Sequence, residues 1–410
     1  MVAAVAGGAR AVARCDALGV PPYSDTPDGL FRGWLGPAFL AAREAVAGWM
    51  TEAGMTVSID AATNLIGRYA GSDPDAPVLL IGSHLDSVRD AGRYDGPLGI
   101  MLGIECVAAL HAAGRRLRFG VEVIAFGDEE GSRFPAAMLT SRAVAGRFDP
   151  ATLALADGEG ITVAEALQGA DPAVAARAGG SVLAYLEAHI EQGPALDREG
   201  LALAAVTGIA AQLRYRVTIE GWAGHAGTTA MPLRRDALAA AAEAILAVER
   251  VGSAGPADLV ATVGRIDVAP GAANVIPGWA TMTLDVRALD AAVRDRAAAE
   301  ILADLAALAA RRGVGVQAEV VHDLAASPCD AALVERLAAA MAAAGHPPRR
   351  LVSGAGHDAM IMAALCPTAM LFVRCRDGIS HNPAEHVDPA DAHAALQVML
   401  GFIDTLESDA

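Results

Sequence analysis

Six residues of the types that bind metal ions or move protons stand beside apolar runs or in glycine-containing loops. They are His84, Asp95, Glu129, Glu130, His189 and His381. Neutral imidazoles and carboxylate oxygens are suitable ligands for Zn²⁺ or Mn²⁺. A hydrolytic site with two metal ions needs roughly five such ligands, one of them a bridging carboxylate. The set therefore predicts a two-metal hydrolytic centre.

Each of these residues has an ordinary alternative when it is taken alone. His84 and Asp86 form a His-x-Asp pair, in which Asp86 would accept the second ring N–H of a metal-bound His84, but a turn histidine has the same pattern. Asp95 lies between glycines and could belong to a simple Asp-Gly turn. Adjacent side chains after a strand point to different sides, so one of Glu129 and Glu130 could bind metal while the other acts as a base. Two solvated acids on a loop are the alternative.

The elements around these residues predict an α/β fold. Residues 78–82 and 120–126 are apolar runs typical of buried strands, and residues 98–113 between them have helical periodicity. This βαβ order predicts a mixed, largely parallel sheet with helices on both faces, and a ligand site beyond the carboxyl ends of its strands. Strand and helix patterns return at 369–373 and 390–406.

A second pattern predicts an inserted lid domain at 211–324, which leaves a discontinuous catalytic domain at 1–210 and 325–410. Two domains are the usual outcome for a chain of 410 residues. The expected order is βαββαβ, a split βαβ (ferredoxin-like) arrangement with strands at 212–220, 259–267, 279–287 and 315–321 and helices at 233–250 and 291–311. Alternation along 280–287 turns Arg287 away from the core of its own domain.

The composition excludes several classes of function. The chain has 31 basic and 48 acidic residues and a net charge of −17, which argues against binding nucleic acid because that affinity comes largely from Lys and Arg. Its uncharged apolar stretches are shorter than the about 20 residues that span a membrane. Five scattered cysteines without CxxC spacing fit a reducing, cytoplasmic compartment. Residues 1–15 are predicted to form a plain N-terminal helix.

Eight short stretches of the chain resemble the peptidase M20 metallohydrolases. They are GSHLDSV (82–88), GRYDGPLGI (92–100), DEEGSRF (128–134), HIEQGP (189–194), HAGTT (225–229), ANVIP (273–277), GAGHDA (354–359) and GISHNPAE (378–385). These stretches are spread over most of the chain and follow the order of the family, so the resemblance is specific. Within the family they are similar to the hydantoinase/carbamoylase branch, which includes N-carbamoyl-L-amino acid hydrolases and allantoate amidohydrolases.

The resemblance implies two divalent metal ions per subunit and a role for each of the six residues. His84, Asp95 and His189 would hold one ion, Asp95 would bridge to a second ion held by Glu130 and His381, and Glu129 would be the general base. In the related peptidases the position of His189 is typically acidic. The histidine therefore favours a ureido bond over a peptide bond.

The resemblance also implies that the inserted domain is a lid that forms a homodimer. His225, Asn274 and Arg287 would then reach the active site of the partner subunit. Arg287 offers a planar fork for a substrate carboxylate, Asn274 offers amide contacts, and His225 could stabilise a tetrahedral oxyanion. An ordinary surface arginine and a turn asparagine are the alternatives. Gln192, Gly356 and His357 would line the same pocket.

The function expected from these observations is hydrolysis of the ureido (N-carbamoyl) C–N bond of a small substrate that carries a carboxylate, with release of ammonia and carbon dioxide. Allantoate is the first candidate substrate and N-carbamoyl-L-amino acids are the second. An aminopeptidase or dipeptidase of the same fold is a further alternative, against which His189 argues. A non-catalytic binding protein on this scaffold would lack a ligand or the base, whereas all six positions are filled.

Overall fold

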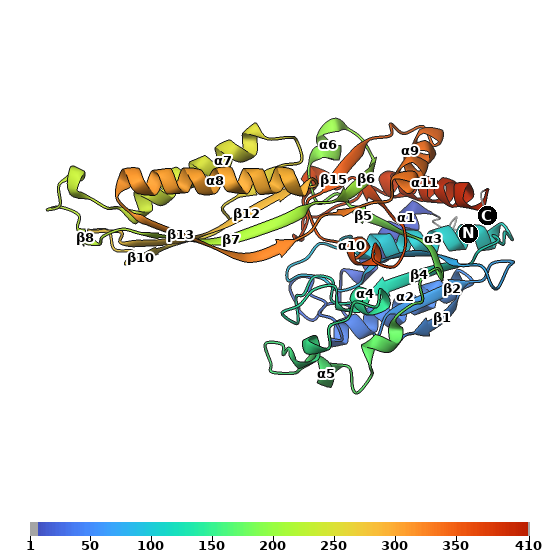
Figure 1. Cartoon of the computed structure of the whole chain (residues 1–410). Helices are drawn as coiled ribbons and strands as arrows, with labels where there is room; N and C mark the ends of the chain where they lie inside the picture. The colour runs from blue at the N-terminus through green and yellow to red at the C-terminus, as the bar shows by residue number, and fades with distance from the viewer. Residues whose placement is uncertain (1–6, 409–410) are drawn as a thin grey trace. The chain divides into compact units, whose positions relative to one another are not determined.

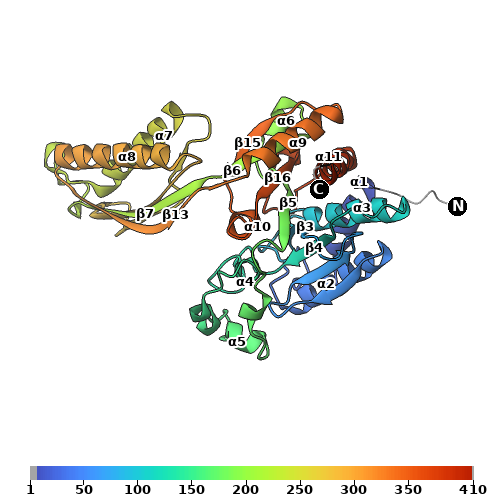
Figure 2. The ribbon, with the colours of Figure 1, turned by 45° about the vertical axis from the view of Figure 1, so that its right-hand side comes forward.

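The computed structural model describes residues 7–408, and the chain divides into two compact units (Figures 1 and 2). Unit 1 combines the chain up to Thr207 with the chain from Cys329 onward, and unit 2 is Gly208–Pro328. Unit 1 carries all six residues of the expected metal centre. Unit 2 carries His225, Asn274 and Arg287.

Unit 1 is built on a nine-stranded sheet with the order β1-β2-β4-β3-β5-β16-β6-β14, in which β15 also pairs with β6. The central strands are β4 (Val121–Phe126), β3 (Val78–His84), β5 (Val182–Ile190) and β16 (Thr368–Val373), and all of them are parallel. The outer strands are β1 (Thr56–Ile59), β2 (Leu65–Tyr69), β6 (Leu203–Ile209), β14 (Ser327–Pro328) and β15 (Arg350–Ser353). The pairings of β1, β2 and β14 are antiparallel, as is that of β6 with β16. The expected mixed α/β fold is confirmed.

The central strands are covered on both faces. Every residue of β3, β4 and β16 is buried, and successive side chains of a strand point to opposite faces. Full burial on both faces explains why these strands are mostly apolar, as is usual for parallel sheets. The long helices of this unit are α1 (Gly8–Leu18), α2 (Pro37–Glu52), α3 (Pro97–Ala112), α9 (Ala331–Ala343) and α11 (Pro389–Glu407). The short ones are α4 (Leu139–Val144), α5 (Val163–Ala166), α6 (Ala195–Glu199) and α10 (Asp358–Met362).

Helix α3 connects β3 to β4, which pair in parallel, so the expected βαβ unit is confirmed. Pro97 occupies the first turn of α3, where its fixed φ fits the helix and its missing N–H costs nothing. Part of the N-terminal helix expected at 1–15 is present as α1, while residues 1–6 lie outside the described residues. All five cysteines are free thiols. Among residues 7–408, no helix is long and apolar enough to cross a membrane.

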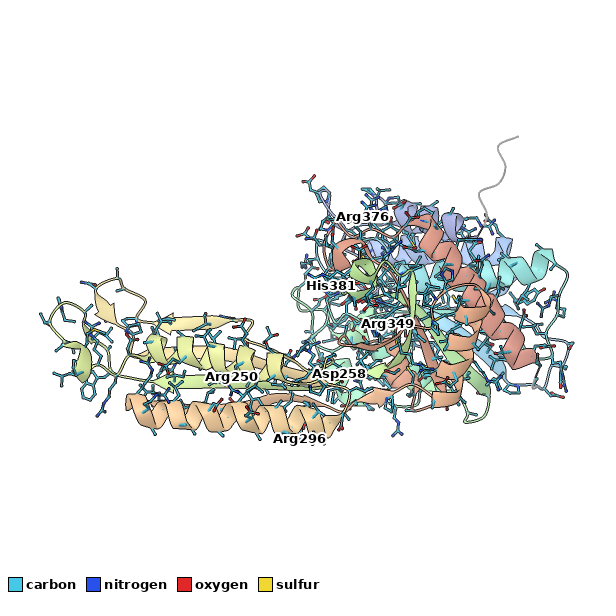
Figure 3. All side chains as sticks on the ribbon, turned by 90° about the horizontal axis from the view of Figure 1, so that it is seen from above. Arg250, Asp258, Arg296, Arg349, Arg376 and His381 are labelled. Atoms are coloured by element: carbon cyan, nitrogen blue, oxygen red, sulfur yellow. The ribbon has the colours of Figure 1, made fainter. Side chains whose placement is uncertain are left out.

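Unit 2 contains a five-stranded sheet with the order β10-β12-β7-β13, to which β9 adds by pairing with β12. Its strands are β7 (Ala211–Glu220), β9 (Val260–Thr262), β10 (Ile266–Ala269), β12 (Trp279–Ala288) and β13 (Gly315–Leu324). All its pairings are antiparallel. Helices α7 (Ala237–Ala254) and α8 (Ala291–Arg312) provide the two crossovers, which gives the split βαβ arrangement. Arg250, which Figure 3 labels on α7, forms ion pairs with Glu300 and Asp304 of α8.

Two expected elements of unit 2 were wrong in their bounds. The strand expected at 259–267 is two strands, β9 and β10. Thr262 pairs with Asp285 and Ile266 pairs with Met282, so three residues lie between the two pairs on this side but only two on β12. One residue is therefore extra, as in a β-bulge. The helix expected from residue 233 begins at Ala237, because Asp236 caps it by accepting the backbone N–H groups of Leu238 and Ala239.

Candidate metal centre

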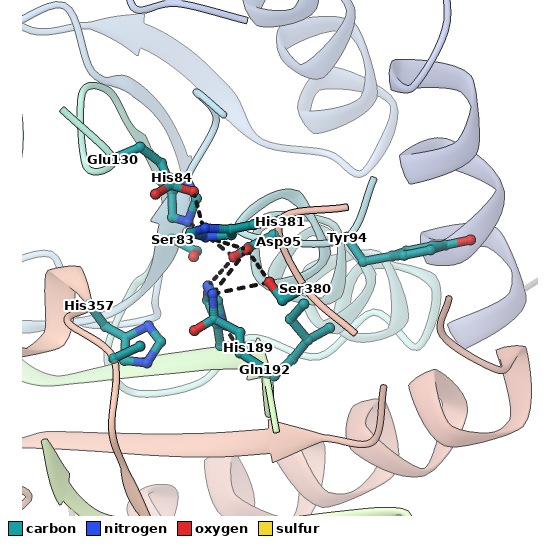
Figure 4. Close-up of polar contacts among 12 residues, drawn as sticks. Ser83, His84, Tyr94, Asp95, Glu130, His189, Gln192, His357, Ser380 and His381 are labelled. Atoms are coloured by element: carbon teal, nitrogen blue, oxygen red, sulfur yellow. Dashed lines mark hydrogen bonds and ion pairs between the residues drawn. The ribbon is translucent and has the colours of Figure 1, made fainter. Parts of the chain in front are cut away.

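The carboxyl ends of neighbouring strands bring the candidate ligands together (Figure 4). His84 is the last residue of β3, and His189 lies one residue before the end of β5. Glu129 and Glu130 follow β4, and His381 lies in the loop that follows β16. Asp95 lies in the loop between β3 and α3. Since these strands are parallel, their carboxyl ends share one edge of the sheet, and the side chains meet there.

Asp95 stands at the centre of the cluster, and its two oxygens face different imidazoles. Oδ1 lies 3.1 Å from Nε2 of His189 and 3.7 Å from Nε2 of His84. Oδ2 lies 3.2 Å from Nε2 of His381, which is also 3.4 Å from Oε1 of Glu130. A carboxylate with this arrangement can serve two cations, one through each oxygen.

Glu129 and Glu130 do not point to different sides, so that expectation from strand alternation was wrong. Each offers a carboxylate oxygen to one group with His84, in which the ligand atoms all lie within 4.8 Å of one another. The physical reason is the backbone at Asp128, whose φ of 58° is left-handed and ends the extended conformation. Period-two alternation does not continue through such a turn.

The hydrogen bond expected between His84 and the Asp86 carboxylate was also wrong. Nδ1 of His84 lies 3.1 Å from the backbone oxygen of Asp86 and 3.8 Å from Oδ1 of its carboxylate. The carboxylate instead accepts the backbone N–H groups of Glu129 and Glu130, each at 3.2 Å. Asp86 therefore orients the acidic loop, while its main chain orients the His84 ring.

Gln192 and Ser380 hold the second oxygen of Asp95. Nε2 of Gln192 donates to Oδ2 at 2.9 Å, and Oγ of Ser380 donates to it at 2.7 Å. Gln192 and His381 both have left-handed φ values, 57° and 54°, which are costly for non-glycine residues and are often found at functional sites. Gly96 is required beside them, because a Cβ there would lie 2.5 Å from the His84 ring.

Two buried polar atoms of this cluster fit a bound cation. Oδ1 of Asp95 and Nε2 of His189 are both buried and lie 3.1 Å apart, but among residues 7–408 neither makes a hydrogen bond of suitable geometry. Buried polar atoms usually have a partner. Three imidazoles and several carboxylates are also the donor set that Zn²⁺ and Mn²⁺ accept. The residues therefore fit two divalent ions.

The electrostatics of the cluster favour positive charge. Burial by itself raises the pKa of Asp95, but the surrounding imidazoles outweigh burial and hold that pKa well below its usual range. Its carboxylate and that of Glu130 raise the pKa of His381 to about 10. Burial lowers the pKa of His84 and of His189, yet nearby carboxylates overcome it and raise both. The carboxylates that stabilise protonated histidines would also stabilise divalent cations at this place.

Glu129 differs from Asp95 in its environment. It is buried, and burial together with the charge of Glu130 raises its pKa well above the usual range, although His84 opposes this. A carboxylate with a raised pKa is a stronger base than an ordinary carboxylate, so it takes up a proton more readily.

Gly356 and His357 were expected to line the substrate pocket with Gln192, and for these two residues that expectation stays a prediction. A cleft of about 520 Å³ beside the cluster is lined by Gln192, Ala355, Gly378, Ile379, Ser380, His381 and Asn382. It includes Gln192 but neither Gly356 nor His357. The ring of His357 is buried with its centroid 4.4 Å from that of His189, and its Nε2 lies 2.8 Å from Oγ of Ser353. Burial and the neighbouring His189 lower the pKa of His357 well below its usual range.

Three supporting side chains were missed by the sequence analysis. Glu187 accepts hydrogen bonds from Oγ of Ser83 at 2.9 Å, from the Tyr185 hydroxyl at 3.1 Å and from the backbone N–H of Ala359 at 2.9 Å. Glu385 and Ser380 contact the Asp95 loop. Glu385 and Ser380 lie within the GISHNPAE stretch, so the motif itself could have pointed to them as supporting residues. Glu187 lies inside an apolar strand, and only its burial in the structure shows that it supports the site.

The three candidate residues of unit 2 lie at two places. His225 in β8 (Gly224–His225) pairs with Val275 of β11 (Val275–Ile276), which brings it next to Asn274, and both residues are exposed. Arg287 is half-buried on β12, whose alternating burial confirms that it points away from the core. Arg214 of β7, which no sequence motif singled out, donates a hydrogen bond to Asp285 beside Arg287.

Comparison with known proteins identifies the class to which this fold and site belong. The family described as Peptidase family M20/M25/M40 matches residues 80–405. An N-carbamoyl-L-amino acid amidohydrolase of Geobacillus stearothermophilus is 44% identical over 87% of this chain and 88% of its own. Allantoate deiminase 1 of Glycine max is 39% identical over 97% of this chain and 89% of its own.

A solved structure gives the same result. The hydantoinase/carbamoylase family amidase of Burkholderia multivorans has a TM-score of 0.90 and 36% identity over 97% of both chains. The chain belongs to peptidase family M20. Within that family it is an amidohydrolase of the hydantoinase/carbamoylase branch.

Proposed function

We propose that this amidohydrolase cleaves the ureido C–N bond of a small substrate that carries a carboxylate. The observation that carries the proposal is the imidazole of His189, which faces Oδ1 of Asp95 at 3.1 Å at a position that is acidic in the related peptidases. Allantoate is the first candidate substrate. N-carbamoyl-L-amino acids are the second candidate. They are supported by the 44% identity between this chain and an amidohydrolase that is named for these compounds.

Two divalent ions, Zn²⁺ or Mn²⁺, are proposed as the cofactors. His84, Asp95 and His189 would hold one, and Asp95, Glu130 and His381 would hold the other, in agreement with two of the side-chain groups that converge here. When bound, the ions would lower the pKa of a water molecule and polarise the scissile carbonyl.

Glu129 is proposed as the general base. Its carboxylate would take the proton of the attacking water and then give a proton to the departing nitrogen, which leaves poorly as an anion. Its burial and its raised pKa support this role, because both favour transient protonation. The reaction consumes one water and converts the ureido group R–NH–CO–NH₂ into the amine, carbon dioxide and ammonia.

We propose that unit 2 is the lid and dimerisation domain and that substrate binding needs a homodimer. The guanidinium group of Arg287 would hold the substrate carboxylate, Asn274 would contact its amide groups, and His225 would stabilise the oxyanion of the tetrahedral intermediate. The adjacency of His225 and Asn274, which the pairing of β8 with β11 fixes, supports a shared task for them.

Ammonia release after metal reconstitution tests the proposal. Allantoate, several N-carbamoyl-L-amino acids and a dipeptide are offered side by side to the full chain loaded with Zn²⁺ or Mn²⁺. We expect turnover of at least one ureido acid and none of the dipeptide. Cleavage of the dipeptide without any ureido turnover would refute the proposal in favour of the peptidase alternative.

A further inference from the structure

One carboxylate connects the loop of Asp95 to the loop of His381. Glu385 stands four residues after His381 and 290 residues from Asp95. Its Oε1 accepts the backbone N–H of Tyr94 at 2.7 Å and that of Asp95 at 3.1 Å. We infer that Glu385 is a positioning residue, which fixes the carboxylate of Asp95 relative to His381.

The burial of these groups makes the connection costly to break. Glu385 is 4% exposed, and both of its hydrogen bonds to the Asp95 loop are buried. Both distances lie in the normal range for N–H···O hydrogen bonds. Without the carboxylate, two buried N–H groups would lack a partner, so the loop would have to move to satisfy them.

Gly92 is an independent sign that the loop is built around Glu385. A Cβ at Gly92 would lie 2.1 Å from the carboxyl carbon of Glu385 and 2.3 Å from each of its oxygens. Any side chain at this position would therefore displace the carboxylate. The glycine that begins the Asp95 loop is the residue that admits Glu385.

The position of Asp95 affects both proposed ions at once. Its two oxygens face different imidazoles, His189 on one side and His381 on the other, so a shift of its backbone changes both groups. Residues that hold metal ligands in place typically change metal affinity by about 10- to 100-fold when they are removed. The inference deepens the proposed metal centre and depends on it.

Two conservative substitutions separate geometry from charge. Glu385→Gln keeps an Oε1 acceptor at the same reach but removes the charge, and Glu385→Asp keeps the charge but is one methylene too short. Co²⁺ is titrated into the chelator-treated full chain and followed by calorimetry and by visible absorption, which reports the ligand geometry. We expect Glu385→Gln to bind Co²⁺ with nearly the wild-type affinity and spectrum. Glu385→Asp should bind about 10- to 100-fold more weakly, with an altered spectrum.

Gly92→Ala should displace the Glu385 carboxylate from the other side of the contact. It should therefore weaken Co²⁺ binding and alter the spectrum as Glu385→Asp does. Glu105→Gln is the matched control, since Glu105 is a carboxylate of 2% exposure that pairs with Arg10 and Arg14. It should bind Co²⁺ as the wild type does, and circular dichroism of each variant shows that it is folded.

Unchanged Co²⁺ binding by Glu385→Asp and Gly92→Ala would overturn the inference. Equal weakening by Glu385→Gln and Glu385→Asp would overturn it too, because charge rather than position would then be what matters. A wild-type chain that binds no Co²⁺ would instead refute the metal centre itself.

Discussion

Arg287 and Asp285 form a two-point ion pair on the face of the unit 2 sheet that is opposite its core. Nε of Arg287 lies 2.9 Å from Oδ1 of Asp285, and Nη2 lies 2.8 Å from Oδ2. Arg214 donates to the same Oδ2 at 2.7 Å. Burial raises the pKa of Asp285, but the two arginines outweigh burial and lower it. One carboxylate thus orients two guanidinium groups, which is a suitable arrangement for recognising the carboxylate of a substrate.

We expect Arg287→Ala to raise KM for a ureido acid by about 10- to 150-fold, because a hydrogen bond to a charged group contributes about 1.5–3 kcal/mol. Steady-state kinetics of ammonia release measure this. Arg216→Ala is the matched control, since Arg216 lies on the same sheet and pairs with Glu319 at 3.0 Å. An unchanged KM in Arg287→Ala would remove this arginine from the substrate site.

Glu129→Gln should keep the bound metal and lose about 10²- to 10⁴-fold in kcat, because the amide cannot take up the proton. Metal analysis by mass spectrometry and single-turnover kinetics check the two parts. Glu130→Gln is the informative comparison, since a lost ligand should weaken metal binding first. A Glu129→Gln variant with full activity would show that another group is the base.

Metal stoichiometry should separate the bridging ligand from the others. Asp95→Ala is expected to lose both ions, because both of its oxygens face ligand groups, whereas His381→Ala is expected to keep one. Mass spectrometry of dialysed protein counts the ions. His346→Ala provides a histidine control away from the cluster. Two ions retained in Asp95→Ala would contradict the bridging arrangement.

The stability of the chelator-treated protein should depend on pH through Asp358. Burial and the charge of Glu187 raise the pKa of Asp358 to about 8, whereas an unfolded aspartate titrates near about 3.9. Between these values the folded state holds a proton that the unfolded state releases. The contribution of Asp358 to the free energy of unfolding therefore falls as pH rises from about 4 to about 8 and levels off above that.

Asp358→Asn should remove that contribution and make the dependence of the unfolding free energy on pH less steep, while other buried carboxyl groups such as Asp128, whose pKa is raised to about 9 by burial, still contribute. Urea unfolding at several pH values measures it, with Asp75→Asn as an exposed control that leaves the slope unchanged. Equal slopes for the wild type and Asp358→Asn would show that Asp358 titrates alike in the folded and unfolded states.

The sequence by itself predicted the βαβ unit around the site, the split βαβ order of unit 2 and the six candidate residues of the centre. The continuous apolar run 78–82 is typical of a strand buried on both faces, and polar residues directly after such strands are expected at one edge of a parallel sheet. The position of His84 was therefore predictable from local pattern, whereas its role depended on the whole set of residues. The alternation along β12 also predicted the direction of Arg287 correctly, since a strand has a fixed period of two.

Only the tertiary structure decided how the side chains meet. Glu129 and Glu130 converge because Asp128 adopts a left-handed φ, and no periodicity extends through such a turn. Asp86 binds backbone N–H groups rather than the His84 ring. Glu385 reaches Asp95 across 290 residues. Such contacts depend on how distant loops pack, so local sequence pattern cannot specify them.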